Sequence, residues 1–434
     1  MRLILTALAF CAATALSAQD GAAQEVADFQ SRELAATSRA ALATGDRLTA
    51  LTSALQGLPA APTEGDLDRF APAYDAFLRA AVSRSLRLDV PVMSVFTFDK
   101  TGRRLASVGL FPSPDGDQSR HGLTLWDANT GAKQAELLPI EAMTSGAWGV
   151  QAPAFSPDGR HLVQMAPTEG VAVVYDTATG QEVARLDGHQ PGTLPNSGGL
   201  AFSRDGSLLL TLGASPTVAH LWDTATWTRL ARQDFGQFTL LAPIAGGRDG
   251  TMQFLSMDVA KGDPPPLELW SITAAGATLT HSFPAEPSGY APLWGRVATD
   301  DGDSVFALPN GNFDLLVFAR SNGAEIARIP ASTMGQATGM VAPSGDGVLL
   351  LSDLEDLPRK VGFDGADAPL VPADKLVGLH NVFALSGEHL GTSADFVGYR
   401  GADLPRGPDL VALVLGALPA ETQAQIAAGR IAPD

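Results

Sequence analysis

Two sequence markers recur with the same period through most of this chain. The first is a turn signal of the Asp-Gly kind, repeated every 40 to 57 residues; its glycines are Gly102, Gly159, Gly206, Gly250, Gly302, Gly347 and Gly387. The second is an aromatic residue at the end of an apolar run, repeated every 45 to 49 residues; its members are Trp126, Tyr175, Trp222, Trp270, Phe318 and Phe363. Such a repeat indicates units that bury their faces only by stacking on one another.

Each repeat unit predicts four short antiparallel strands. Its order is strand, Asp-Gly turn, strand, loop, aromatic-ended strand, second turn and final strand, with glycine supplying the positive φ that tight turns need. Four strands in roughly 45 residues are typical of a β-propeller blade. Seven turn signals therefore predict a mainly all-β chain, with a seven-bladed β-propeller over residues 84–405.

Two of the units resemble WD40 repeats. They are AFSPDGRHLVQMAPTEGVAVVYDTATGQEVARLDGHQ and LAFSRDGSLLLTLGASPTVAHLWDTATW, and Gly188-His189 precedes Trp222-Asp223 by the family's usual distance. The aromatic-Asp signature of the repeat is Trp126-Asp127, Tyr175-Asp176 and Trp222-Asp223. This resemblance implies a WD40-like propeller.

The WD40 resemblance also implies a buried hydrogen-bond network in one blade. In that family the network joins a histidine, a strand hydroxyl, a turn aspartate and the tryptophan. By position His189, Thr211 and Trp222 match three of these members. Residues 214–216 are Ala-Ser-Pro where the aspartate is expected, so the resemblance implies a partial network.

Residues 19–83 predict a helical hairpin, because their apolar residues recur every three or four positions. One helix is expected from Glu25 to Ala43, a second after an Asp46 N-cap, and a third after Pro72. This segment and the first blade resemble the helical linker and first blade of large bacterial WD40 proteins. Since an effector domain precedes the linker in those relatives, the resemblance implies an exported scaffold that lacks the effector.

Residues 1–18 have the features of a secretory signal peptide. Arg2 precedes an apolar run from Leu3 to Leu16, and small residues stand at positions 15, 17 and 18. We expect cleavage after Ser17 or Ala18 and release into the periplasm without stable membrane insertion, because the run is too short for a permanent span. Acylation of Cys11, the only cysteine, is the alternative.

The charge of the chain disfavours nucleic acid as a partner. The sequence has 29 Lys and Arg against 47 Asp and Glu, for a net charge of −18. Such a chain repels a phosphate backbone. Loss of Arg2 with the signal peptide would make the mature charge one unit more negative.

The sequence contains none of the common catalytic motifs. There is no G-x-S-x-G, P-loop, H-E-x-x-H or S-x-x-K pattern, and the seven histidines are scattered. Residues 115–119 resemble a calcium loop, but Arg120 and Trp126 stand where such a loop needs Gly and Glu. We therefore expect no cofactor and no metal. The run Pro264–Pro266 is either an ordinary loop or a polyproline recognition segment.

Residues 406–434 are expected to form a C-terminal extension, with a strand in the apolar run before Leu418 and a helix starting near Pro419. Two segments compete to close the ring. Residues 84–90 are expected to supply the outer strand of the final blade, whose other strands come from about residues 379–402, and the rival is residues 409–415.

These features together favour a non-catalytic periplasmic protein-interaction scaffold. A propeller presents a rigid disc with loops on two faces, and its fold alone implies no chemistry. The expected partners are unidentified envelope proteins. The alternative is a periplasmic propeller enzyme of the hydrolase or lactonase type, with its site at the mouth of the channel.

Overall fold

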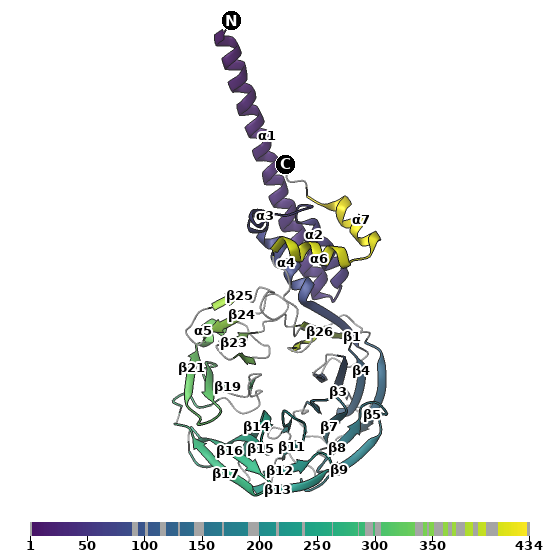
Figure 1. Ribbon diagram of the computed structural model, residues 1–434, viewed down its shortest axis with the longest axis vertical. Coiled ribbons are helices and arrows are strands. Elements are labelled where there is room, and N and C mark those ends of the chain that lie inside the picture. Colours follow the sequence, from purple (N-terminus) through teal and green to yellow (C-terminus); the bar gives the residue numbers. More distant parts are fainter. Residues whose placement is uncertain are drawn as a thin grey trace.

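The computed structural model shows seven β-sheets arranged in a ring, with a helical module on one side (Figure 1). It describes residues 2–88, 94–99, 103–112, 119–128, 131–142, 152–166, 169–189, 199–213, 217–236, 239–262, 264–284, 286–290, 298–299, 305–334, 342–344, 347–350, 359–362, 367–369, 378–384, 389–395 and 407–431. Before residue 22 and between residues 342 and 395, the description covers the backbone alone. The predicted mainly β fold with seven blades is confirmed.

Six blades have four strands each, in chain order from the centre of the ring outward. Blade 1 is β2 (Ser94–Phe98), β3 (Arg104–Pro112), β4 (Ser119–Asp127) and β5 (Lys133–Ala142). Blade 2 is β6 (Ala154–Phe155), β7 (His161–Ala166), β8 (Val171–Asp176) and β9 (Glu182–Leu186). Blade 3 is β10 (Gly199–Phe202), β11 (Leu208–Gly213), β12 (Val218–Asp223) and β13 (Thr228–Asp234).

The next three blades follow the same order. Blade 4 is β14 (Thr239–Arg248), β15 (Thr251–Asp258), β16 (Leu267–Thr273) and β17 (Gly276–Ser282). Blade 5 is β18 (Ala298–Thr299), β19 (Val305–Pro309), β20 (Leu315–Ala319) and β21 (Glu325–Ile329), followed by the short helix α5 (Ala331–Met334). Blade 6 is β22 (Ala342–Ser344), β23 (Gly347–Leu350), β24 (Arg359–Gly362) and β25 (Asp367–Pro369).

In blades 2 to 5 the second and third strands lie in the hydrophobic core, and the fourth strand is mostly exposed. All six residues of β11 are buried, whereas no residue of β13 is. The cause is stacking, because a neighbouring blade covers each face of the middle strands and both faces must then be apolar. One core cluster includes Leu210 of blade 3 with Phe254 of blade 4, so the blades share their cores.

The seventh blade closes the ring with strands from distant parts of the chain. Strand β1 (Ser83–Leu88) lies at the edge of a sheet with β26 (Gly378–Ala384) and β27 (His389–Asp395). It pairs in parallel with β26, from Ser83 opposite Leu379 to Leu88 opposite Ala384. The predicted closure by the segment before the first blade is confirmed. The parallel pairing sets this blade apart from the other six, where neighbouring strands are antiparallel.

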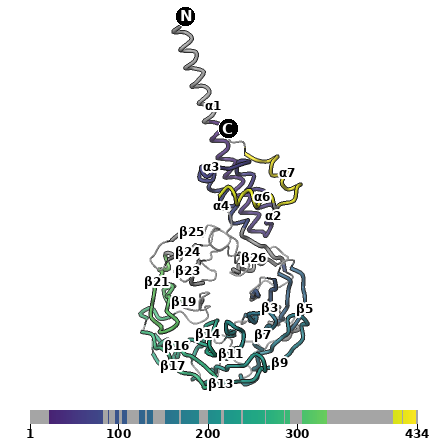
Figure 2. Tube along the Cα trace, viewed as in Figure 1, coloured from purple at the N-terminus to yellow at the C-terminus, as the bar shows by residue number. Residues whose placement is uncertain are grey.

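The helical module combines N-terminal and C-terminal parts of the chain, as Figure 2 shows by its purple and yellow segments lying together. Its helices are α1 (Arg2–Ala43), α2 (Arg47–Gln56), α3 (Glu64–Arg69), α4 (Ala71–Val82), α6 (Gly407–Ala417) and α7 (Ala420–Gly429). Asp46 caps α2 as predicted, accepting a hydrogen bond from Thr49 N at 3.1 Å. Helix α4 continues directly into β1, so the module is joined to the ring through its closing strand.

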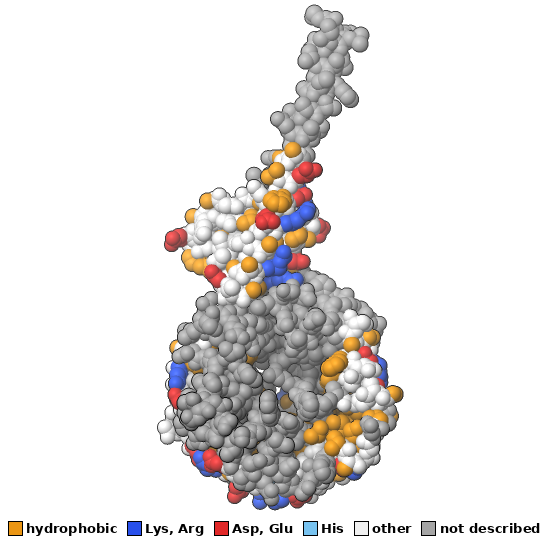
Figure 3. Space-filling view, turned by 180° about the vertical axis from the view of Figure 1, so that it is seen from behind, with side chains coloured by type: hydrophobic (Ala, Val, Ile, Leu, Met, Phe, Trp, Pro, Cys, Tyr) orange, Lys and Arg blue, Asp and Glu red, His pale blue; other side chains and the backbone are white. Residues whose placement is uncertain are grey.

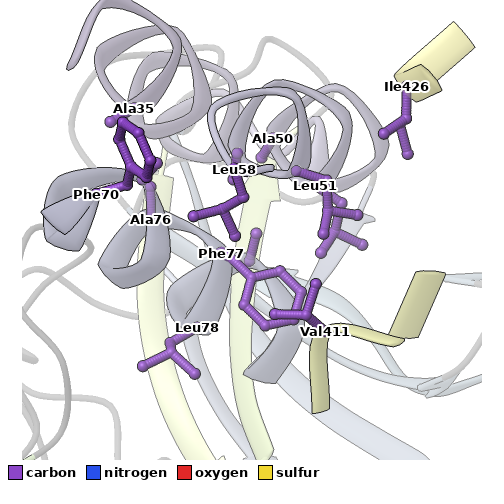
Figure 4. Close-up of a cluster of buried hydrophobic side chains, with 14 of the residues drawn as sticks. Ala35, Ala50, Leu51, Leu58, Phe70, Ala76, Phe77, Leu78, Val411 and Ile426 are labelled. Atoms are coloured by element: carbon purple, nitrogen blue, oxygen red, sulfur yellow. The ribbon is translucent and has the colours of Figure 1, made fainter. Parts of the chain in front are cut away.

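The expectation of a strand at residues 409–415 is wrong, because this segment lies within α6. Its apolar residues also fit a helical period, and Pro408 and Asp409 suit a first helical turn. Leu410 and Val411 are buried with Phe77 and the other core residues of the N-terminal helices (Figure 4). The apolar run therefore packs on the helical module and not on the ring.

Helix α7 is fixed by hydrogen bonds to the end of α2. Ile431 N donates to Gln56 O at 3.0 Å, and the Gln56 side chain donates to Gln425 O at 3.1 Å. Arg430 donates to Pro59 O at 3.0 Å. Among the described residues, no helix is both long and apolar enough to cross a membrane.

Candidate interaction surface

The two faces of the ring differ in the length of their loops. In an antiparallel blade, the first-to-second and third-to-fourth connections lie at one edge, and the remaining connections lie at the other. In blades 1 to 6, the first kind are two to five residues long, and we name this side the short-turn face. The second kind run from four residues to the fifteen residues 283–297, and we name this side the long-loop face.

The short-turn face is held by side chains that hydrogen-bond to their own turns. Asp176 accepts hydrogen bonds from Thr179 N at 2.8 Å and Thr179 Oγ1 at 2.9 Å, and these bonds hold the pKa of Asp176 below its usual value. Asp223 accepts equivalent bonds from Thr226, which likewise lower its pKa. In blade 1 the Asp127 backbone closes the corresponding turn, with its N–H donating to Ala132 O at 2.8 Å. These signature aspartates therefore make turns.

The structure brings His189, Thr211 and Trp222 together in blade 3. Trp222 Nε1 donates to Thr211 Oγ1 at 2.9 Å, and His189 Nε2 lies 2.8 Å from the same hydroxyl. All three side chains are buried, with Trp222 only 3% exposed. Residues 214–216, where the turn aspartate was sought, lie outside the described residues. The Thr211 hydroxyl is within hydrogen-bond distance of both the Trp222 and the His189 ring, so this site stabilises the blade.

Two further tryptophans make the same bond to hydroxyls that the sequence analysis did not identify. Trp126 Nε1 donates to Ser107 Oγ at 2.7 Å in blade 1, and Trp270 Nε1 donates to Ser256 Oγ at 3.0 Å in blade 4. In each case the hydroxyl residue is paired with the residue two positions before the tryptophan. This strand pairing could have identified the two serines from the sequence. The loop between the two strands varies in length, however, so serine and tryptophan are not separated by a constant number of residues.

Where the strand-ending aromatic residue has no indole N–H, the residue at the position of the hydroxyl changes as well. In blade 5 the aromatic residue is Phe318, and Leu308 occupies the position of the hydroxyl. Phe has no N–H to satisfy, so an apolar neighbour leaves no buried polar group. In blade 2 Tyr175 has Gln164 at this position.

A second histidine packs against the blade 3 network. The His220 ring is stacked on Trp222 at 5.5 Å and lies edge-on to His189 at 4.6 Å. Burial, aided by the charges of Arg229 and Arg232, lowers the pKa of His189 to about 4. Burial likewise lowers the pKa of His220 to about 3. Both imidazoles are therefore neutral at neutral pH, which suits a packed site and not a proton-transfer site.

The described residues contain no cluster of three or more His, Cys, Asp or Glu side chains able to hold a metal ion. The calcium-like loop at residues 115–119 falls mainly outside the described part of the chain. Two of the other histidines pack on aromatic rings: His161 lies edge-on to Trp227 at 5.2 Å, and His281 to Phe283 at 4.8 Å. These contacts are structural.

The best described part of the long-loop face lies over blades 4 and 5. It joins residues 258–262, 264–266, 283–284, 286–290 and 310–314, which we name the loop cluster. Gly311 N donates to Gly289 O at 2.7 Å, and a Cβ on Gly289 would lie 3.6 Å from Pro264 Cβ. The three loops are thus in contact with one another.

An ion pair between the buried Glu286 and the exposed Arg328 joins the loop cluster to β21. Arg328 donates to both carboxylate oxygens of Glu286, at 3.1 and 2.9 Å, and these bonds hold the pKa of Glu286 below its usual value. Asn310 Nδ2 donates to Glu286 Oε1 at 3.2 Å, while Asn310 Oδ1 accepts from Asn312 N and Asp314 N. The sequence does not reveal this set of residues because its members lie far apart in the chain. The result is a rigid base beneath exposed loops.

Apolar side chains are exposed on this surface. Val259 and Phe313 project from two of the loops, Pro284 and Pro287 are exposed in the third, and Pro264–Pro266 are half-buried. In the space-filling view from behind, hydrophobic side chains gather along one side of the ring as well as on the helical module (Figure 3). The surface offers contact area and shape, and its described side chains include no group of His, Cys, Asp and Glu that could hold a metal ion.

No family model and no curated protein matches the sequence. Among solved structures, the chain is similar to U3-55K (15% identity, TM-score 0.44, covering 72% of this chain and 89% of that one). It is also similar to the WD40 repeats of RRP9 (14% identity, TM-score 0.44, 72% and 88% covered). A chain of the mitotic checkpoint complex gives 14% identity and a TM-score of 0.43, with 69% and 84% covered.

Proposed function

We propose that this protein is a non-catalytic protein-interaction scaffold of the periplasm that binds its partners on the long-loop face. The observation that carries the proposal is the difference between the two faces. The turns of one face are short and bonded to themselves, while the connections of the other reach fifteen residues. Long loops on a rigid frame are where binding residues concentrate.

The periplasmic part of the proposal rests on the sequence. The single Arg2, the apolar run from Leu3 and the small residues at positions 15, 17 and 18 fit an export signal. The described core of α1 begins at Ala27, beyond the expected cleavage site, so removal of residues 1–18 takes away no core side chain that the structure describes. Envelope proteins are the partners that such a location would supply.

Crosslinking in intact cells, followed by mass spectrometry, tests the scaffold directly. We expect one or a few envelope proteins crosslinked through residues of the long-loop face. The purified chain should also be assayed against lactone, ester and phosphoester substrates, with and without Ca²⁺. Metal-dependent hydrolysis that an Asp or His substitution abolishes, together with no specific crosslinked protein, would replace the scaffold by the enzyme.

A further inference from the structure

The turn between β19 and β20 contains an aromatic residue that is exposed and has an unfavourable backbone conformation. Phe313 is 71% exposed and its backbone has φ of 65°. A bulky residue is less stable than glycine in the left-handed region. Gly311 and Asn312, which suit such a conformation better, stand directly before it. The folded chain therefore holds a phenylalanine where neither packing nor backbone geometry favours one.

Packing compensates for the positive φ of Trp227 but not for that of Phe313. Trp227 also has a positive φ, of 54°, but its ring lies against His161 of the neighbouring blade and the blade 2–3 core. Among the described residues, no ring or cation packs on Phe313, whose backbone N–H donates to Asn310 O at 3.0 Å. An exposed aromatic ring held in an outlying backbone conformation points to a contact with another molecule.

The Phe313 turn is rigid, so the ring is presented in a fixed place. Asn310 is fully buried and accepts hydrogen bonds from Asn312 N at 3.0 Å and Asp314 N at 2.9 Å. Asp314 Oδ1 in turn accepts from Ala331 N at 2.9 Å. Preorganisation of this kind reduces the entropy lost when a partner binds.

The charges around the loop cluster select the chemistry of the partner. Carboxylates outnumber cations among the described side chains in and beside it: Asp258, Glu268, Glu286, Asp314 and Glu325 against Lys261 and Arg328. The whole chain has the same sign, with a net charge of −18. The face of a phenylalanine ring attracts a cation, and a carboxylate-rich surrounding strengthens that preference.

We propose that the loop cluster, which includes Phe313, binds a basic segment of a partner protein that places an arginine or lysine on the Phe313 ring and apolar side chains against the exposed prolines. This inference rests on the proposed function and adds to it the place of contact and the class of partner. Lipid surfaces do not fit it, because the anionic surface of most bacterial membranes would meet a negatively charged protein.

A random peptide library of about 12 residues, selected on the purified full chain, tests the proposal. We expect enriched peptides to contain arginine or lysine together with apolar residues. Their affinity should fall about tenfold or more for Phe313→Asn, because an aromatic anchor is lost, and should weaken as salt rises from about 50 to about 300 mM. Asn tolerates a positive φ, so the thermal midpoint of this variant should be unchanged or higher.

Ile326→Asn is the matched control. Ile326 is 44% exposed on β21 of the same blade, outside the loop cluster, and this variant should bind the peptides as the unaltered chain does. Peptides that bind Phe313→Asn equally well, or that are acidic or uncharged, overturn the proposed contact but leave the scaffold standing. If no peptide is enriched, the contact is overturned; if cell crosslinking then also finds no partner, the scaffold fails with it.

Discussion

Three tryptophans of the ring are fixed by the same bond, from indole Nε1 to a hydroxyl on the preceding strand. Trp126, Trp222 and Trp270 make it in blades 1, 3 and 4, and their three hydroxyl partners lie in equivalent registers. Thr211 differs from the two serines because it also meets His189. A single hydroxyl thus satisfies two buried rings, and its removal leaves two polar groups without that partner.

Thr211→Val tests this bond. The substitution keeps the shape of the side chain but deprives Trp222 Nε1 and His189 Nε2 of their partner, so we expect a loss of about 1–3 kcal/mol in the free energy of unfolding. Thr278→Val, on the exposed face of β17, should change it by less than about 0.5 kcal/mol. Urea unfolding followed by circular dichroism measures both, and equal midpoints for the two variants would contradict the assignment.

The buried histidine pair predicts a loss of stability in mild acid. The folded pKa values of about 4 for His189 and about 3 for His220 lie below the ordinary value of 6.5. The unfolded chain therefore binds more protons between these values, and stability falls as pH drops from about 6.5, at up to about 1.4 kcal/mol per pH unit for each histidine.

The measurement is the free energy of unfolding at pH 7.5 and pH 5 for the unaltered chain and for His189→Asn. We expect the acid-induced loss to be smaller in the variant by about 1–2 kcal/mol. The turn carboxylates Asp176 and Asp223 have lowered pKa values and titrate below this window, so they contribute little to the difference. An identical pH dependence in the two chains would show that His189 is not buried in the neutral form.

Helix α6 shows how an element at the end of the chain can complete a core made by its beginning. Val411 is buried against the helices of residues 27–82, while Leu413, two positions later on the same helix, is 50% exposed. The helical module and the seventh blade are therefore each assembled from residues more than 290 positions apart. Neither is complete before the distant part of the chain has joined it.

Val411→Asp and Leu413→Asp form a matched pair for this element. A carboxylate at position 411 would be buried without a partner, and we expect a loss of about 3 kcal/mol or more. The same carboxylate at position 413 faces water and should cost less than about 0.5 kcal/mol. Thermal unfolding and limited proteolysis of the helices report the difference, and similar midpoints for the two variants would contradict the position of α6.

The sequence was sufficient for those features that repeat or act locally. Turn glycines recur in all seven repeat units of the sequence and strand-ending aromatics in six of them, and the Asp46 cap of α2 involves residues three apart. Features formed by distant residues were missed. The valine and leucine residues of 409–415 fit the repeat of a strand as well as that of a helix, so the sequence allows a strand there. The apolar surface of α2 and α4 selects the helix. Glu286, Asn310 and Arg328 likewise meet only in the folded ring.

The exposed Phe313 could not be recognised from sequence for a different reason. Its neighbours Asn310, Gly311, Asn312 and Asp314 are residue types that favour turns, and they connect β19 to β20. Which of these residues takes the left-handed conformation depends on the bonds made by the buried Asn310 side chain. The sequence also contains other phenylalanines at strand ends, such as Phe318, that are buried.

The burial of side chains along α1 indicates where the mature protein can begin. Helix α1 runs from Arg2 to Ala43 without a break, but the first side chain that the structure describes as buried is Ala27. Residues 22–26 are exposed or half-exposed, and a hydrogen bond from Arg69 of α3 to Gln24 O at 3.2 Å joins this segment to the helical module. A peptidase can therefore cut after Ser17 or Ala18 and leave the described core of the module complete.

Intact-mass analysis of the protein from a periplasmic extract checks this prediction. We expect a chain that begins at Ala18 or Gln19, and a thermal midpoint within about 2 °C of the full chain, because no described core side chain is removed. Removal of residues 1–43 is the contrasting case: it takes Ala27, Ala35 and Leu42 from the core and should abolish cooperative unfolding of the module. A chain from the periplasm that still carries residues 1–17, or lipid on Cys11, would contradict export by cleavage.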